Sequence, residues 1–145
     1  MVQGSRLIDN GFLGRHRLYH RCKNDDIIDG RIIPAKIRID RPSVNWSKYG
    51  KPWDVIFDDP GCGIVQFVVR NLPKELPRER PIDSGTRICS FFPSHDPLCF
   101  NYAHCEIRPF HDGKEIASKS LGKIVKKEFR TVMSNKGLLL LAPSV

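Results

Sequence analysis

The sequence predicts an α+β fold, in which a small mixed or antiparallel sheet of about five short strands is packed by one C-terminal amphipathic helix. Two features lead to this prediction. Residues 101–108 alternate between apolar and polar side chains, which is typical of a strand with one buried face. From Lys114 onward the apolar residues recur with the period of a helix.

The remaining strands are predicted from shorter patterns. Residues 31–40 alternate and are expected to form a strand. Because of Pro34, this strand either lies at a sheet edge or begins after the proline. Residues 63–69 form an apolar run typical of a buried strand, and residues 86–92 and 138–141 favour two more, the last being either a strand or a packing tail. Residues 6–23 indicate a short helix or strand with one basic side. The Pro-, Ser- and Gly-containing segment 41–50 is expected to be an irregular loop.

The predicted helix has one apolar stripe, and Gly137 is well placed to end it. The stripe consists of Ala117, Leu121, Ile124, Val125, Glu128, Val132 and Met133, with Phe129 beside it. Basic residues are expected to cover the remaining surface.

The length of 145 residues favours a single compact domain, residues 1–145, with a Pro-rich exposed loop at 71–85. The start of the chain has no apolar stretch typical of a secretory signal, and the longest apolar run is too short to span a bilayer. Five cysteines, an odd number, favour a reduced setting. We therefore expect a cytoplasmic protein that does not enter a membrane.

The excess of 24 Lys and Arg over 16 Asp and Glu gives a net charge of +8, which favours a polyanionic partner. The candidate nucleic-acid-binding residues are Lys119, Lys123, Lys126, Lys127 and Arg130 on the helix, extended by Arg15, Arg17 and Arg21 near the N-terminus. A solvated helix face whose lysines confer solubility explains the same pattern.

The 101–108 strand carries the candidate catalytic residues. An imidazole can gain and lose a proton near neutral pH, so His104 is a candidate general acid or base, with Glu106 or Arg108 as its charge partner. Alternatively, His104 is a structural histidine that binds a neighbouring loop.

A second polar group lies in the 41–50 segment. Ser43, Asn45 and Ser47 alternate and could present two hydroxyls and an amide to one ligand, although capping and turn formation explain these residues equally well. The surroundings of Ser43 do not resemble the Gly-x-Ser-x-Gly elbow of a serine nucleophile.

Metal and phosphate signatures are incomplete. His16, His20 and Cys22 are potential zinc ligands, and Cys99 and His104 could complete the site, but no Cys-x2-Cys pair exists and zinc is not favoured. The His-x-Glu of residues 104–106 lacks the downstream Pro-Cys-x-x-Cys of zinc deaminases. The glycines of residues 59–63 have neither Walker nor dinucleotide-binding spacing. We therefore expect no cofactor.

Two short blocks, Ser43-Val-Asn-Trp-Ser47 and Asn101-Tyr-Ala-His-Cys-Glu-Ile107, resemble those of a family of small prokaryotic proteins without an assigned activity. The Gly-containing apolar strand between them, residues 63–67, fits the same pattern, so the resemblance covers roughly residues 30–110. It implies that Ser43 and His104 share one site, and that the protein accompanies defence or mobile-element genes.

The sequence therefore favours an accessory protein that contacts nucleic acid or a larger protein or nucleoprotein assembly. A first alternative is a small metal-independent hydrolase or transferase that acts on RNA or a nucleotide, with His104 as acid and base and with Ser43 and Asn45 positioning the substrate. A second is a protein–protein adaptor that binds through Trp46, Tyr49 and Trp53 without any polyanion.

Overall fold

One antiparallel sheet of eight strands organises the computed structural model, which describes residues 2–3, 6–78 and 87–144. The main path of the sheet runs β12 (Leu138–Leu141), β7 (Gly63–Val68), β3 (Arg17–Cys22), β6 (Ser43–Trp46), β10 (His104–His111), β9 (Arg87–His95) and β8 (Leu76–Arg78). The short strand β11 (Lys114–Glu115) pairs with β10. Two small hairpins lie outside this sheet: β1 (Val2–Gln3) with β2 (Arg6–Leu7), and β4 (Ile27–Ile28) with β5 (Arg31–Ile32).

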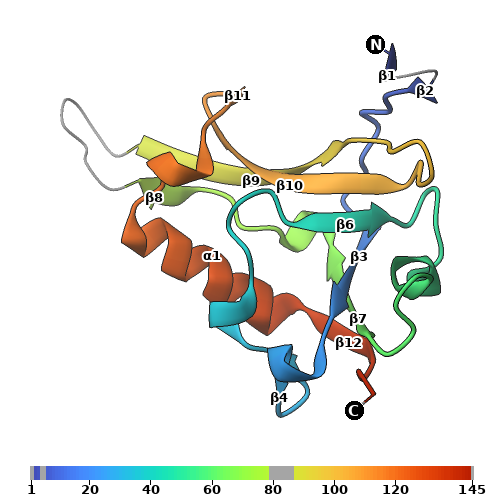
Figure 1. The fold of residues 1–145 in the computed structure, drawn as a ribbon. Helices are drawn as coiled ribbons and strands as arrows, with labels where there is room; N and C mark the ends of the chain where they lie inside the picture. Colours follow the sequence, from blue (N-terminus) through green and yellow to red (C-terminus); the bar gives the residue numbers. More distant parts are fainter. Residues whose placement is uncertain (1, 4–5, 79–86, 145) are drawn as a thin grey trace.

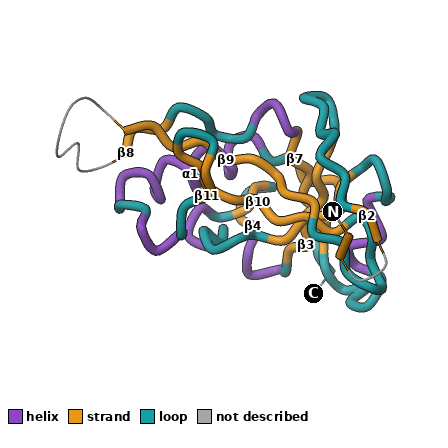
Figure 2. Tube along the Cα trace, turned by 90° about the horizontal axis from the view of Figure 1, so that it is seen from above, coloured by secondary structure: helices purple, strands orange, loops and turns teal. Residues whose placement is uncertain are grey.

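The single α-helix of the described residues, α1 (Lys123–Lys136), lies across one face of this sheet (Figure 1). Viewed from above, β9 and β10 run along the middle of the molecule and α1 lies near β8 (Figure 2). The α+β class with one C-terminal helix is therefore confirmed. The expectation of about five strands was wrong, because short segments that contain Pro, Ser or Asn also join the sheet.

The core lies between α1 and the sheet face that it covers. Phe129 of α1 and Phe91 of β9 are both fully buried, with ring centroids 4.2 Å apart. Trp46 of β6 is also fully buried in this core. Burying an aromatic side chain stabilises a domain by several kcal/mol, so these rings hold α1 and the sheet together.

The helix is shorter and rotated compared with the sequence-based expectation. It begins at Lys123, and Lys119 lies before it in a short 3₁₀ helix, η5 (Ser118–Ser120). The buried positions of α1 are Val125, Phe129, Met133 and Ser134, while Ile124 is 58% exposed. Phe129 therefore lies at the centre of the apolar stripe, whereas the sequence placed it beside the stripe.

Gly137 ends α1, as predicted, but for a different reason. Its φ of −67° is not left-handed, so the usual glycine cap is absent. A Cβ at this position would lie 2.9 Å from atoms of Phe67 and Val65 on β7. The glycine is therefore required by the close approach of the helix end to the sheet.

Two expected elements differ from the structure. Residues 31–40 do not form one strand: β5 is followed by the 3₁₀ helix η2 (Pro34–Lys36), and Ile37 and Ile39 are buried without joining the sheet. The segment expected to be an irregular loop contains β6, which pairs with β3 on one side and β10 on the other.

The expected exposed loop at 71–85 is in part ordered within the fold. Leu72 is buried in the core, and residues 76–78 form β8. The rest of that expected loop, residues 79–85, lies outside the described residues. No helix among the described residues has the length and apolar character needed to cross a membrane.

Candidate active site

The register of the central strands brings the two polar blocks together. In the pairing of β10 with β6, His104 lies opposite Asn45 and Glu106 lies opposite Ser43. Directly opposite residues in an antiparallel pair project to the same face of the sheet. Ser43, Asn45, His104 and Glu106 therefore share the face that α1 does not cover. The alternation predicted for the second block is confirmed, because Cys105 and Ile107 are buried on the other face.

His104 lies between Ser43 and Asp96. Its Nε2 atom is 3.2 Å from the hydroxyl oxygen of Ser43, and its Nδ1 atom is 2.8 Å from the carbonyl oxygen of Asp96. The Oδ2 atom of Asp96 is also only 3.5 Å from Nδ1. Ser43 is exposed, whereas the His104 side chain is only 13% exposed.

These contacts determine the tautomer of the His104 ring. A carbonyl oxygen can only accept a hydrogen bond, so Nδ1 must carry the proton. In the neutral ring Nε2 is then unprotonated, and its lone pair faces the Ser43 hydroxyl, which donates to it. A serine next to a histidine that a third group orients is the arrangement for general-base activation of a hydroxyl. The group that orients His104 is the Asp96 main-chain carbonyl, with the Asp96 carboxylate beside it.

Asp96 is the partner of His104 that the sequence did not indicate. It follows β9 in the loop that leads to Asn101, and its main-chain N–H donates to the carbonyl oxygen of His104 at 3.0 Å. An Asp-Pro pair in a loop is a common turn signal, so residue type and spacing do not single it out. Its role depends on the pairing of β9 with β10.

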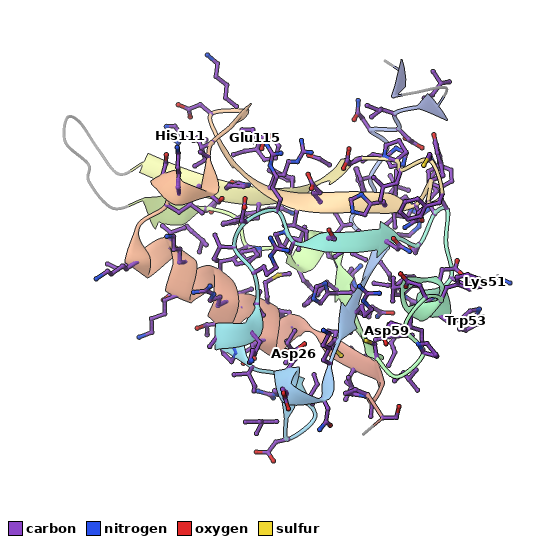
Figure 3. The ribbon with its side chains drawn as sticks, viewed as in Figure 1. Asp26, Lys51, Trp53, Asp59, His111 and Glu115 are labelled. Atoms are coloured by element: carbon purple, nitrogen blue, oxygen red, sulfur yellow. The ribbon has the colours of Figure 1, made fainter. Side chains whose placement is uncertain are left out.

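The expected charge partners of His104, Glu106 and Arg108, bind each other instead. The Nη2 and Nε atoms of Arg108 lie 2.6 Å and 3.1 Å from Oε1 of Glu106. Arg108 also contacts Glu115 at 3.3 Å, and Arg41 binds the other oxygen of Glu115 at 2.9 Å. Glu115 is seen beside His111 at the β10–β11 hairpin in Figure 3.

The main chain at Ser43 is held by His20 and follows a residue in the left-handed conformation. The Nδ1 atom of His20 lies 2.9 Å from the Ser43 carbonyl oxygen and donates to it. Arg41, two residues earlier, has a φ of +47°, which a residue with a side chain rarely adopts. Strained backbone of this kind is concentrated near functional sites.

Asn45 and Ser47 are less available than the alternation of the sequence indicated. Asn45 is buried, and its Oδ1 atom accepts a 2.8 Å hydrogen bond from Asn101. The hydroxyl oxygen of Ser47 accepts a 2.9 Å hydrogen bond from the main-chain N–H of Arg17. Both side chains therefore stabilise the strands that present Ser43 and His104.

A second histidine group lies on the other face, where it fastens the N-terminal segment. Nδ1 of His95 accepts a 2.8 Å hydrogen bond from the main-chain N–H of Asp9, and Nε2 donates to the Tyr102 carbonyl oxygen at 2.6 Å. The Asp9 carboxylate binds Lys48 and the Tyr49 hydroxyl, and these contacts hold its pKa well below the usual range.

His16 completes this attachment. Its Nδ1 atom accepts from the Leu13 main chain and from Nε1 of Trp46, both at 3.0 Å. Phe12 stacks on Trp46 with ring centroids 3.9 Å apart. His95 and His16 thus act as hydrogen-bond acceptors that anchor the segment over Trp46.

The potential zinc ligands are not gathered into one site. His16 is bound to Trp46, while His20 is bound to the Ser43 main chain. Burial raises the pKa of the Cys22 thiol to about 11 and raises that of Cys105 further, so both behave as small apolar side chains. Within residues 2–3, 6–78 and 87–144, no three His, Cys, Asp or Glu side chains are grouped to hold a metal ion.

The candidate nucleic-acid-binding residues are divided over the molecule. Lys119, Lys123 and Lys127 are exposed, Lys126 is partly buried, and Nε of Arg130 donates to the Ile37 carbonyl oxygen at 2.9 Å. Arg15, Arg17 and Arg21 are exposed and lie on or next to β3, where Arg21 binds Asp58 at 3.0 Å. Arg17 and Arg21 alternate with Leu18 and Cys22 of the core, so they face away from α1.

Comparisons with protein-family models, with curated proteins and with solved structures found no match to this chain.

Proposed function

We propose that this protein is a small hydrolase or transferase in which His104 transfers protons between the reacting groups. The observation that carries the proposal is the position of Nε2, whose lone pair faces the Ser43 hydroxyl while Nδ1 is held by Asp96. A histidine on the face of a sheet that no helix covers can bind any nearby loop. In His104, Nδ1 is held by the Asp96 carbonyl oxygen, and Nε2 directs its lone pair at the exposed Ser43 hydroxyl.

The surroundings of His104 support the same role. The ring is mostly enclosed, yet the hydroxyl that it contacts is exposed, so a substrate can reach the oxygen without displacing the histidine. Two strands that flank β6 and β10 fix the main chain on each side. A group held on paired strands keeps its geometry better than one on a loop.

The test is a comparison of His104→Gln with the wild-type protein. An amide cannot exchange a proton near neutral pH, but its nitrogen can still donate to the Asp96 carbonyl oxygen, so the fold should be retained. Labelled RNA, a nucleoside triphosphate and p-nitrophenyl acetate are the substrates. We expect turnover of at least one of them, reduced by about a hundredfold or more in His104→Gln.

His111→Gln is the matched control, since His111 lies on the same strand at the hairpin end (Figure 3). It should retain wild-type turnover. Turnover that survives in His104→Gln, or a wild-type protein inactive on all three substrates, contradicts the proposal. Circular dichroism of both variants shows whether any loss reflects unfolding.

A second candidate function is binding of a polyanion, either alone or as an accessory component of an assembly. The net charge of +8 and three exposed lysines, Lys119, Lys123 and Lys127, within nine residues of chain support it. Lys123 and Lys127 lie on α1, which covers the sheet face opposite to Ser43, and Lys119 lies just before the helix in η5.

A further inference from the structure

We propose that Ser43 is the nucleophile of this site and that its substrate is an uncharged carboxylic ester, an inference that rests on the proposed role of His104. The Ser43 hydroxyl is the group that the Nε2 lone pair faces, and it is exposed. A serine hydroxyl is a weak nucleophile unless a base accepts its proton as it attacks. The 3.2 Å contact supplies such a base.

A comparison of His104 with His95 and His20, which lie on β9 and β3, shows that this contact is specific. His95 carries its proton on Nε2, because Nδ1 accepts from a main-chain N–H. His20 carries a proton on Nδ1 and donates it to a carbonyl oxygen, which has no proton to give in return. Among these three histidines, only His104 directs an unprotonated nitrogen at a hydroxyl.

The charges around Ser43 favour a neutral substrate. The residue directly opposite Ser43 is Glu106, and Asp96 lies beyond His104. Three guanidinium groups on or next to this face are engaged: Arg108 and Arg41 bind Glu106 and Glu115, and Arg21 of β3 binds Asp58. The charges of these groups largely cancel, so a phosphodiester would find no guanidinium among these three that lacks a carboxylate partner to balance its own charge. A carboxylic ester has no charge to balance.

The reaction conserves every atom. The Ser43 oxygen forms a bond to the ester carbonyl carbon while its proton moves to Nε2 of His104. The carbon–oxygen bond to the alcohol then breaks, and the leaving oxygen takes the proton from Nε2. A water molecule next gives a proton to Nε2 and attacks the acyl carbon, and the Ser43 oxygen leaves and recovers its proton. The products are an acid and an alcohol.

The experiment combines a covalent probe with a pair of substrates. An alkyl fluorophosphonate reacts with an activated serine when the oxygen displaces fluoride from phosphorus, which leaves a stable adduct. We expect intact mass and peptide mapping to place one adduct on Ser43 in the wild-type protein. The rate of labelling should fall by about a hundredfold or more in Ser43→Ala and His104→Gln. Hydrolysis of p-nitrophenyl acetate should fall in parallel, while p-nitrophenyl phosphate should not be hydrolysed.

Ser94→Ala is the matched serine control. Ser94 lies opposite Glu106 in the pairing of β9 with β10, so it shares the same sheet face. The Ser94→Ala variant should form the adduct on Ser43, as the wild-type protein does.

The outcomes separate the two proposals. If His104→Gln abolishes turnover but Ser43→Ala retains it, His104 acts on water or substrate directly, and Ser43 is not the nucleophile. If both variants retain turnover, both proposals fail. An adduct on another residue, or hydrolysis of the phosphate in preference to the acetate, overturns the assignment of nucleophile or of substrate class.

Discussion

Three histidines have three different tasks in this molecule because their neighbours differ. His95 accepts from the Asp9 main chain, His16 accepts from Trp46 and the Leu13 main chain, and His104 accepts from a hydroxyl. A main-chain N–H or an indole cannot react, so the first two histidines are structural. Only the third faces a group with chemistry of its own.

The pH dependence of stability is expected to follow from His16. Burial, followed by the charges of Arg15 and Lys48, lowers its pKa, and Asp9 opposes the shift. The folded state therefore favours the neutral ring, whereas the unfolded chain binds a proton near pH 6.5. The contribution to stability is complete above that pH and is lost as the pH falls through it towards the lower folded pKa.

We expect the Tm of the wild-type protein to decrease between pH 7.5 and pH 5, and to decrease less in His16→Gln, whose side-chain oxygen can accept from Trp46 without titrating. His20, whose pKa is also lowered by burial, contributes to the remaining slope. Thermal unfolding at a series of pH values measures both slopes. His111→Gln is the control, and equal slopes in His16→Gln and the wild-type protein would assign the pH dependence to other groups.

At the level of elements, the strands with a clear alternation were the ones that the sequence could predict. Residues 104–107 of β10 alternate because one face is buried and the other is not, and the run 63–68 is apolar because β7 is mostly buried. The β6 segment was missed because Pro42, Ser43 and Asn45 favour turns locally. Its pairing with β3 and β10 on both sides outweighs that preference.

The opposite error occurred at residues 37–40. Ile37 and Ile39 alternate with charged residues, as in a strand, and both are buried. They are buried without a partner strand, because Arg130 of α1 takes the Ile37 carbonyl oxygen as its acceptor. The alternation of residues 37–40 therefore predicted their burial correctly. Whether they pair with a strand depends on Arg130, which is far along the chain.

The attachment of the edge strand β12 depends on Gly63 at the start of β7. A Cβ at this position would lie 2.7 Å from the nitrogen and Cδ atoms of Pro143 and still closer to the Leu141 carbonyl oxygen. These are backbone and ring atoms that cannot move alone, so Gly63→Ala should displace the end of β12. We expect a loss of about 1–3 kcal/mol in the free energy of unfolding, as for other overpacked sites.

Urea denaturation measures this loss, and hydrogen exchange should show reduced protection at residues 138–141. The control is Gly61→Ala, where the added Cβ would lie at an ordinary 3.6 Å from the Ser144 hydroxyl oxygen. If both variants have the same urea midpoint, the close approach at Gly63 does not limit the packing of β12.

At the level of the whole molecule, the sheet separates two surfaces of different character. The face with Ser43 carries the carboxylates of Glu106 and Asp96 next to the histidine, together with the exposed Arg17 and Arg21, whereas Lys123 and Lys127 lie on α1 at the other face. The sequence predicted the strand of His104 and the helix of Lys123 and Lys127, but it placed Ser43 in a loop and Lys119 in the helix, and these residues lie in β6 and in η5. It could not show that Arg17 and Arg21 face away from α1, because this depends on which side of the sheet the helix covers.

Polyanion binding is tested by charge reversal on the α1 side. Changing Lys119, Lys123 and Lys127 to Glu should weaken binding of labelled RNA or DNA and reduce the salt slope by about two to three units, since each lost phosphate contact removes close to one. The matched control reverses Lys51, Lys74 and Lys114, three exposed lysines elsewhere that give the same change in net charge. Equal weakening in both triple variants would mean that net charge alone attracts the nucleic acid.

The anchoring of the N-terminal segment over Trp46 also has a spectroscopic consequence. The protein has two tryptophans, and Trp46 is fully buried under Phe12 whereas Trp53 is 61% exposed, as its outward position in Figure 3 shows. A water-soluble quencher should therefore remove the emission of Trp53 first and leave that of Trp46. Because the segment closes directly over the Trp46 ring, the residual fluorescence becomes an intrinsic optical signal that reports when the start of the chain detaches.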